Sequence, residues 1–244
     1  MLQKLFLDDE IRELINFGGW NHVFDFEEET LKEPTLEFLC TFRLTQTINP
    51  NDSTAVSFRL YGVSHQMSFG EFGRHCGFYS RDFMIIEEYR SSIFFPPPEP
   101  EIQRFWTQIS TESSYRTNLS KASKVKSPAL RYLHNLLAHS ISGRSQSTGS
   151  MTRQDLFYLY CIVERVHCHL GFAFAHYVMN LVTRSRIKAI TAGAFITRIA
   201  RSVGVPVRSP PFRLECRMKS MIMEVLRNLQ LVERQRDPRD LFIL

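Results

Sequence analysis

Apolar residues recur at three- and four-residue intervals over most of the chain, which is the spacing that places them on one face of a helix. This pattern covers Leu5 to Asn16, a short segment that contains Pro34, Glu99 to Ile109, and the long stretch from Ser127 to Gly204. Polar side chains fill the intervening positions, as expected of helices that bury one face. We therefore predict a mainly α-helical fold, a multi-helix globular bundle.

Capping residues predict where several of these helices begin. Ser127-Pro128 combines an N-cap with proline at the first helical position. Thr152-x-x-Asp155 and Ser68-x-x-Glu71 have the spacing of capping boxes, in which two side chains bond reciprocally to backbone amides. Breaks predict the ends: we expect the helices to be separated at Gly143 and at Leu170-Gly171, with later helices over Phe172–Thr183, over Ile187–Val203 and after Leu214.

The period changes to two where Ala55-Val-Ser-Phe-Arg-Leu-Tyr61 alternates apolar and polar side chains. Gly62 follows, and His65-Gln-Met67 is placed to return antiparallel to this strand. We predict one small β-hairpin near residues 55–68, which feeds directly into the helix that Ser68 opens.

Composition adds that the chain is a globular protein. Of its 244 residues, 43% are apolar and 23% charged, and the five cysteines are odd in number and scattered, which argues against a disulfide framework. No apolar run reaches the roughly 18 residues of a membrane span, and the first residues turn acidic too early for a signal peptide. We expect a nuclear or cytoplasmic protein that is not secreted and has no membrane partner.

Charge is unevenly distributed along the chain. Residues 1–114 hold 9 Lys/Arg against 18 Asp/Glu, whereas residues 115–217 hold 16 against 3. We predict an acidic N-terminal lobe at 1–114, a basic helical core at 115–207, and a helical tail at 208–244 that is cut from a longer reading frame; the lobes form one domain or several. The two halves can attract each other, within or between molecules, and the basic part can bind a polyanion such as nucleic acid.

The triple proline at Pro96-Pro-Pro98 forbids helix and favours an extended segment. It is either a rigid connection between lobes or a ligand for an SH3-type domain. A protein–protein adaptor would use this proline segment together with the apolar faces of the helices.

We find no pattern that predicts a metal site, a cofactor or an enzyme. Cysteine and histidine cluster only at Cys161, His167, Cys168, His169 and His176, without the paired spacing of a zinc site. The chain lacks a nucleophile elbow, a dinucleotide-binding turn, a His-Glu-x-x-His helix and a paired-carboxylate motif. We expect a non-enzymatic protein.

The candidate binding site is a loop for a phosphate group. Residues 143–149 are rich in Gly, Ser and Thr and lead into a helix N-terminus, where backbone amides and the helix dipole attract anions. The loop lacks the Gly-Lys-Ser/Thr ending of a nucleotide-binding loop. The residues that we predict to contact a nucleic-acid backbone are Arg144, Ser145, Arg153, Arg184, Arg186 and Lys188.

The chain resembles the first-open-reading-frame protein of plant Athila-type Gypsy retrotransposons over roughly residues 34–205. The matching blocks are Ala129-Leu-Arg-Tyr-Leu-His-Asn-Leu-Leu-Ala-His-Ser-Ile-Ser-Gly-Arg144, Ser147-Thr-Gly149, Asp155–Tyr160, Ala192–Ala200, Val56–Gly62 and Ser68–Phe72. The hairpin-then-helix unit is also loosely similar to the plant mobile domain of transposon-derived proteins.

This resemblance implies a gag-like or accessory protein of a transposable element, with self-association into a homo-oligomer and binding to RNA or DNA. The Cys-x2-Cys-x4-His-x4-Cys zinc knuckle common in gag proteins is absent, so we expect electrostatic rather than sequence-specific binding. The alternative is an adaptor of transposon origin that binds other proteins and no nucleic acid.

Overall fold

The computed structural model describes residues 8–24, 28–45, 51–142, 144, 148–183, 192–205, 232–234 and 241–243. The chain forms two compact units. The first unit comprises Met1–Asn21, Phe95–Val166 and Arg217–Leu244, and the second comprises His22–Phe94 and His167–Cys216. Each unit therefore combines residues of the acidic segment with residues of the basic segment. The three lobes predicted from charge stay predictions.

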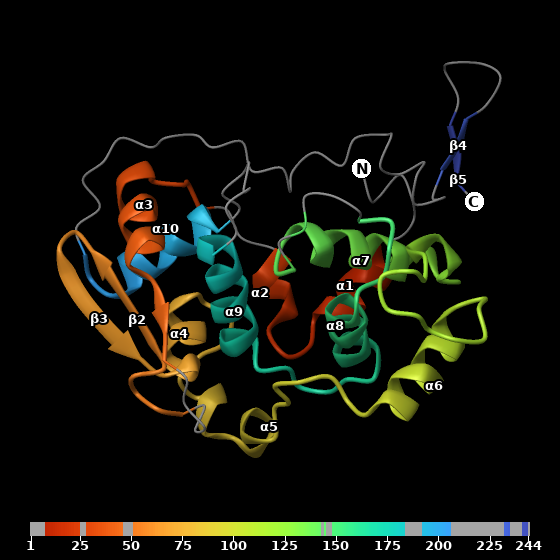
Figure 1. Ribbon diagram of the computed structural model, residues 1–244, viewed down its shortest axis with the longest axis horizontal. Helices are drawn as coiled ribbons and strands as arrows, with labels where there is room; N and C mark the ends of the chain where they lie inside the picture. The colour runs from red at the N-terminus through yellow and green to blue at the C-terminus, as the bar shows by residue number, and fades with distance from the viewer. Residues whose placement is uncertain are drawn as a thin grey trace. The chain divides into compact units, whose positions relative to one another are not determined.

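The described core of the first unit is helical (Figure 1). Helices α7 (Pro128–His139) and α8 (Arg153–Val163) pack against each other, α1 (Asp8–Ile15) packs on both, and α6 (Glu99–Ile109) packs on α8. Fully buried side chains between them include Trp106, Leu133, Leu137 and Phe157. Helix α2 (Trp20–Phe24) begins in this unit, where Trp20 meets Tyr158 edge-on at 5.5 Å between ring centroids.

The second unit packs helices on a three-stranded antiparallel sheet (Figure 1). The strand order is β1 (Arg43–Leu44), β2 (Val56–Leu60), β3 (Val63–Met67). Helix α3 (Lys32–Thr41) packs on β2 and on α10 (Gly193–Ser202), while α4 (Phe69–His75) packs on α9 (Leu170–Thr183). Two short elements, η2 (Phe83–Ile85) and α5 (Glu87–Arg90), pack against each other in the segment between α4 and residue 94.

Aromatic rings fill the centre of the second unit. Phe72 lies 5.8 Å from Phe174 and 5.9 Å from Phe42 between ring centroids, and Phe174 lies 4.6 Å from Phe195. All of these rings are buried. They join α3, α4, α9 and α10 into one core, which explains why the sequence carries so many phenylalanines.

The predicted hairpin is confirmed, and the structure adds a strand to it. Tyr61 and Gly62 form its two-residue turn, both with positive φ, as hairpins of this length require. The additional strand β1 pairs with β2 through Arg43 and Leu44. A two-residue strand has too few positions to show a period in the sequence.

Two of the three predicted helix starts are confirmed in full. The Ser127 hydroxyl accepts from the Leu130 amide at 3.2 Å, and Thr152 and Asp155 form a complete capping box. At Ser68 only half of the box is present, since Ser68 accepts from the Glu71 amide. The Glu71 carboxylate instead accepts two hydrogen bonds from Arg74, at 2.8 and 2.6 Å.

The predicted break between α8 and α9 exists but lies at residues 164–169 and not at Leu170-Gly171. Helix α9 begins at Leu170, and Gly171 lies in its first turn. A Cβ on Gly171 would stand 2.0 Å from the Phe69 carbonyl oxygen, so glycine permits α4 and α9 to approach closely.

Other predictions fall partly outside the described residues. The helix predicted over Ile187–Val203 is described from Gly193 as α10, and the one predicted after Leu214 lies in a stretch that the structure does not describe. The described residues of the tail are two short antiparallel strands, β4 (Val232–Arg234) and β5 (Leu241–Ile243). No helix in the described part of the chain is both long and apolar enough to cross a membrane.

Candidate functional site

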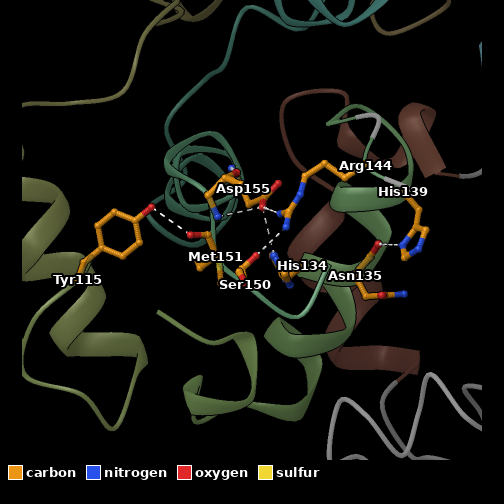
Figure 2. Close-up of polar contacts among 9 residues, drawn as sticks. Tyr115, His134, Asn135, His139, Arg144, Ser150, Met151 and Asp155 are labelled. Carbon is orange, nitrogen blue, oxygen red and sulfur yellow. Dashed lines mark hydrogen bonds and ion pairs between the residues drawn. The ribbon is translucent and has the colours of Figure 1, made fainter. Parts of the chain in front are cut away.

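The predicted anion loop connects α7 to α8 in the first unit, and its arginine points inward. Arg144 forms an ion pair with Asp155, whose side chain is fully buried (Figure 2). The side chain of Arg144 is itself only 13% exposed. A second guanidinium nitrogen donates to the Ser150 carbonyl at 3.0 Å, and the Arg144 amide donates to the Ala138 carbonyl at 2.7 Å. Arg144 therefore fastens the loop at both of its ends.

Asp155 is the centre of this cluster because it has several partners at once. One carboxylate oxygen, Oδ2, accepts from the Thr152 amide at 3.1 Å and faces His134 Nε2 at 3.3 Å, besides pairing with Arg144. Burial tends to raise the pKa of the Asp155 carboxyl, but the hydrogen bond and charge of His134, the Arg144 cation and the contact with Thr152 outweigh it. The pKa of Asp155 is therefore held below its usual range.

A carboxylate beside a buried histidine can orient that histidine as a general base, but an active site also needs a group whose proton the histidine accepts. His134 is 0% exposed, and its Nδ1 has no hydrogen-bond partner among the described residues. No described hydroxyl or thiol therefore lies where His134 could accept its proton. The geometry is that of a cluster that orders the junction between two helices.

Arg153 begins α8 and reaches toward α6. It pairs with Glu99 and donates to the Pro97 carbonyl at 3.4 Å. Both partners of the ion pair are open to solvent, with side chains 40% and 51% exposed. The contact with Pro97 ties the proline segment to α8 within the first unit. Whether the segment is a rigid connection or a ligand stays a prediction.

The remaining predicted residues cannot be placed. Ser145 and the cluster Arg184, Arg186 and Lys188 lie outside the described residues. Of the predicted set, the structure brings only Arg144 and Arg153 to the start of α8, and each pairs with a carboxylate of its own unit. Whether these residues bind an anion stays a prediction.

Acidic and basic segments also meet in the second unit. Glu28 pairs with Arg201, and its other carboxylate oxygen lies 3.9 Å from the Arg198 side chain. Together with Glu99 and Arg153 in the first unit, this shows that part of the charge asymmetry is neutralised inside the fold. The uneven charge in the sequence predicts that the acidic and basic segments can attract each other within one molecule. The ion pairs Glu99–Arg153 and Glu28–Arg201 show such contacts among the described residues.

Two further arginines of the basic segment are buried or contact other residues of the first unit. Arg131 lies buried in α7, where burial lowers its pKa. Arg165 stacks over the Phe17 ring at 5.5 Å and donates to the Glu13 carbonyl at 3.0 Å.

One further basic surface lies outside the predicted set of residues. The connector between α6 and α7 carries Arg116, Lys121 and Lys124, which are exposed and form no ion pair among the described residues. In the sequence, Lys121-Ala-Ser-Lys124-Val-Lys126 shows only as a basic linker. The signal in the sequence is that apolar Ala122 and Val125, which the structure buries, lie between the lysines.

The second unit contains a serine beside a histidine, the pair of side chains that a serine hydrolase uses. His75 Nδ1 lies 2.7 Å from the Ser202 hydroxyl, while His75 Nε2 lies 2.9 Å from the Arg74 guanidinium. Because a guanidinium only donates, Nε2 is the acceptor and Nδ1 carries the proton. His75 therefore donates to Ser202 and cannot take its proton. Burial, followed by the charge of Arg74, lowers the pKa of His75 and favours this neutral form.

No three His, Cys, Asp or Glu side chains converge to form a potential metal site in the part of the chain that the structure describes.

Comparison with known proteins gives one match. The model of the ATHILA ORF-1 family matches residues 1–165. Neither the curated proteins nor the solved structures contain a match to the chain.

Proposed function

Since this chain belongs to the ATHILA ORF-1 family, and is thus an Athila-type retrotransposon protein, we propose that it is a gag-like or accessory protein in the replication of its element. In this role it binds RNA or single-stranded DNA through electrostatic contacts and associates with further copies of itself. The looser kinship with the plant mobile domain, which rests on the hairpin β2–β3 followed by α4, is part of the same proposal.

The observation that carries the nucleic-acid role is the presence of exposed cations that the fold does not neutralise. Arg144, Arg153, Arg198 and Arg201 pair with carboxylates of their own units. Arg116, Lys121 and Lys124 remain exposed with no such partner among the described residues. Unpaired surface lysines and arginines supply the sequence-independent part of nucleic-acid affinity.

The absence of a zinc knuckle from the sequence predicts that binding is governed by charge rather than by base identity. Affinity should then depend steeply on salt, because each phosphate contact releases condensed counterions. Neither property requires a cofactor or a catalytic residue.

The test is a binding titration of the purified full chain with fluorescent single-stranded RNA and DNA, from about 50 to 300 mM salt, in the range where counterion release is measurable. Multi-angle light scattering under the same conditions gives the mass. We expect affinity that falls steeply with salt, similar affinity for unrelated sequences, and a mass above that of the monomer. No binding at the lowest salt would refute the nucleic-acid role and leave the adaptor as the alternative.

A further inference from the structure

The connector between α6 and α7 contains the short 3-10 helix η3 (Ala122–Lys124) and is tied to its surroundings by backbone hydrogen bonds. On one side, the Lys126 amide donates to the Ile109 carbonyl at 2.8 Å, and the Thr111 amide donates to the Lys124 carbonyl at 2.9 Å. On the other side, the Ala122 amide donates to the Gly149 carbonyl at 3.0 Å. The loop is thereby fixed to the end of α6 and to the segment that precedes α8.

The same network holds the tip of the loop. The Asn118 amide donates to the Met151 carbonyl at 3.2 Å, and the Met151 amide donates to the Ser120 carbonyl at 2.8 Å. The Tyr115 hydroxyl donates to the same Met151 carbonyl at 3.3 Å (Figure 2). A loop with this many backbone bonds presents its outward side chains from a fixed frame.

Side chains along the connector divide into two groups. Tyr115, Ser120, Ala122 and Val125 are buried and attach the loop to the unit. Arg116, Lys121, Lys124 and Lys126 are exposed. The Lys126 ammonium already forms hydrogen bonds within the unit, because it donates to the Thr107 and Gln108 carbonyls at the end of α6. The other three cations have no hydrogen bond to an acid among the described residues.

The surrounding sequence contains unusually few acids. From Ser113 to Gln154 there is no Asp or Glu. Glu112 precedes this stretch and Asp155, which pairs with Arg144, follows it. From another segment, Glu10 of α1 accepts from the Ser127 hydroxyl at 3.2 Å. The positive potential of the connector is therefore not offset by acids of its own segment.

We propose that the connector from Arg116 to Lys126 is the surface that holds the phosphate backbone of a single-stranded nucleic acid. This inference rests on the proposed function and deepens it, because it assigns the contact to a surface other than the loop before α8. In that loop Arg144 forms an ion pair with Asp155. In the connector Arg116, Lys121 and Lys124 are exposed and form no ion pair among the described residues.

The chemistry of the connector fits a phosphate backbone better than bases. Lysine presents a compact, strongly hydrated charge that suits phosphate oxygens without reading sequence. The connector's own aromatic residue, Tyr115, is buried and so cannot stack on a base. An acidic protein surface is the competing partner, and the experiment distinguishes it.

The experiment compares two triple variants of the full chain. The test variant carries Arg116→Gln, Lys121→Gln and Lys124→Gln. The control carries Arg81→Gln, Arg90→Gln and Arg104→Gln, which removes the same charge from exposed positions of the acidic segment. Both variants are compared with the unchanged chain by circular dichroism, to show that they fold, and then in RNA titrations across salt.

We expect the test variant to bind RNA roughly a hundredfold more weakly at about 50 mM salt, with a slope of log affinity against log salt that is shallower by about 2 for three lost phosphate contacts. The control should keep the affinity and slope of the unchanged chain. The mass of the test variant by light scattering should equal that of the unchanged chain.

Four outcomes would overturn the assignment. Equal binding by the test variant and the unchanged chain would refute the connector while leaving the proposed function intact. An equal loss in the control would show that net charge alone matters. Loss of self-association in the test variant with RNA binding retained would identify the connector as a protein-binding surface. Absence of RNA binding by the unchanged chain would refute both proposals together.

Discussion

Acidification should destabilise the second unit through His169, which is 2% exposed. Its ring stacks on Phe94 with 4.5 Å between centroids. Nδ1 accepts from the Phe172 amide at 3.1 Å and caps α9, so the proton of the neutral ring is on Nε2, 3.0 Å from the Tyr89 hydroxyl. A proton added to Nδ1 would face the Phe172 amide and destroy the cap.

The sign and size of the effect follow from the pKa. Burial lowers the pKa of His169 from 6.5 to about 4. The folded protein therefore prefers the neutral ring, and the unfolded chain binds the proton more tightly. This contribution to stability is complete above pH 6.5 and is lost as the pH falls toward 4. Between pH 7 and pH 4.5 the free energy of unfolding should fall by about 2 to 3 kcal/mol on this account.

The matched variant is His169→Asn, because asparagine also caps helices but does not titrate. Urea denaturation is followed at pH 7 and pH 4.5 by circular dichroism. Tryptophan fluorescence reports separately on the first unit, which contains both Trp20 and Trp106. The variant should be less stable at pH 7, because it loses the stacking on Phe94, but should lose about 2 to 3 kcal/mol less than the natural chain on acidification. Equal losses in both proteins would refute the reasoning.

Two further substitutions test the packing and the buried cluster by the same denaturation assay. Gly171→Ala should lower the free energy of unfolding by about 1 to 3 kcal/mol or more, because its Cβ would stand 2.0 Å from the Phe69 carbonyl oxygen. The control Gly149→Ala, whose Cβ would have nothing within 4 Å, should change it by less than about 0.5 kcal/mol. A small effect at both positions would contradict the close approach of α4 and α9. Arg144→Met should lower the free energy of unfolding by about 3 kcal/mol, because Asp155 would stay buried without its cation. The control Arg153→Met should lower it by less than about 1 kcal/mol, because that ion pair is exposed. Similar losses in both variants would show that Arg144 is not a buried ion-pair partner.

Local signals in the sequence were sufficient for much of the fold. Ser127-Pro128 and Thr152-x-x-Asp155 act within one helical turn, so their effect can be predicted without tertiary structure, and both helix starts are confirmed. The alternating strand before Gly62 is equally local. The mainly α-helical class, with its small hairpin, follows from such signals.

The errors arise where a residue has a distant or competing partner that its local sequence pattern does not reveal. Gly171 was interpreted as a break because glycine disfavours helices, but its role is to admit the backbone of α4, about a hundred residues earlier in the chain. Glu71 has the capping-box spacing, yet Arg74 competes for its carboxylate. A local rule cannot weigh such competing partners.

The candidate site shows the same division. The sequence identified Asp155 as a capping residue, which is confirmed. It did not reveal that the same carboxylate binds Arg144 and His134, because that depends on how α7 and α8 pack. For the same reason the sequence could not separate Arg144, which serves the fold, from Lys121 and Lys124, which face solvent.

The most direct test of the central claim is to map where RNA touches the protein. The full chain, bound to uridine-containing single-stranded RNA at low salt, is cross-linked with ultraviolet light, and the linked peptides are identified by mass spectrometry. The account predicts cross-links concentrated between Tyr115 and Lys126, which disappear when competing RNA or high salt is added. Salt-sensitive cross-links that all lie elsewhere in the chain would contradict it.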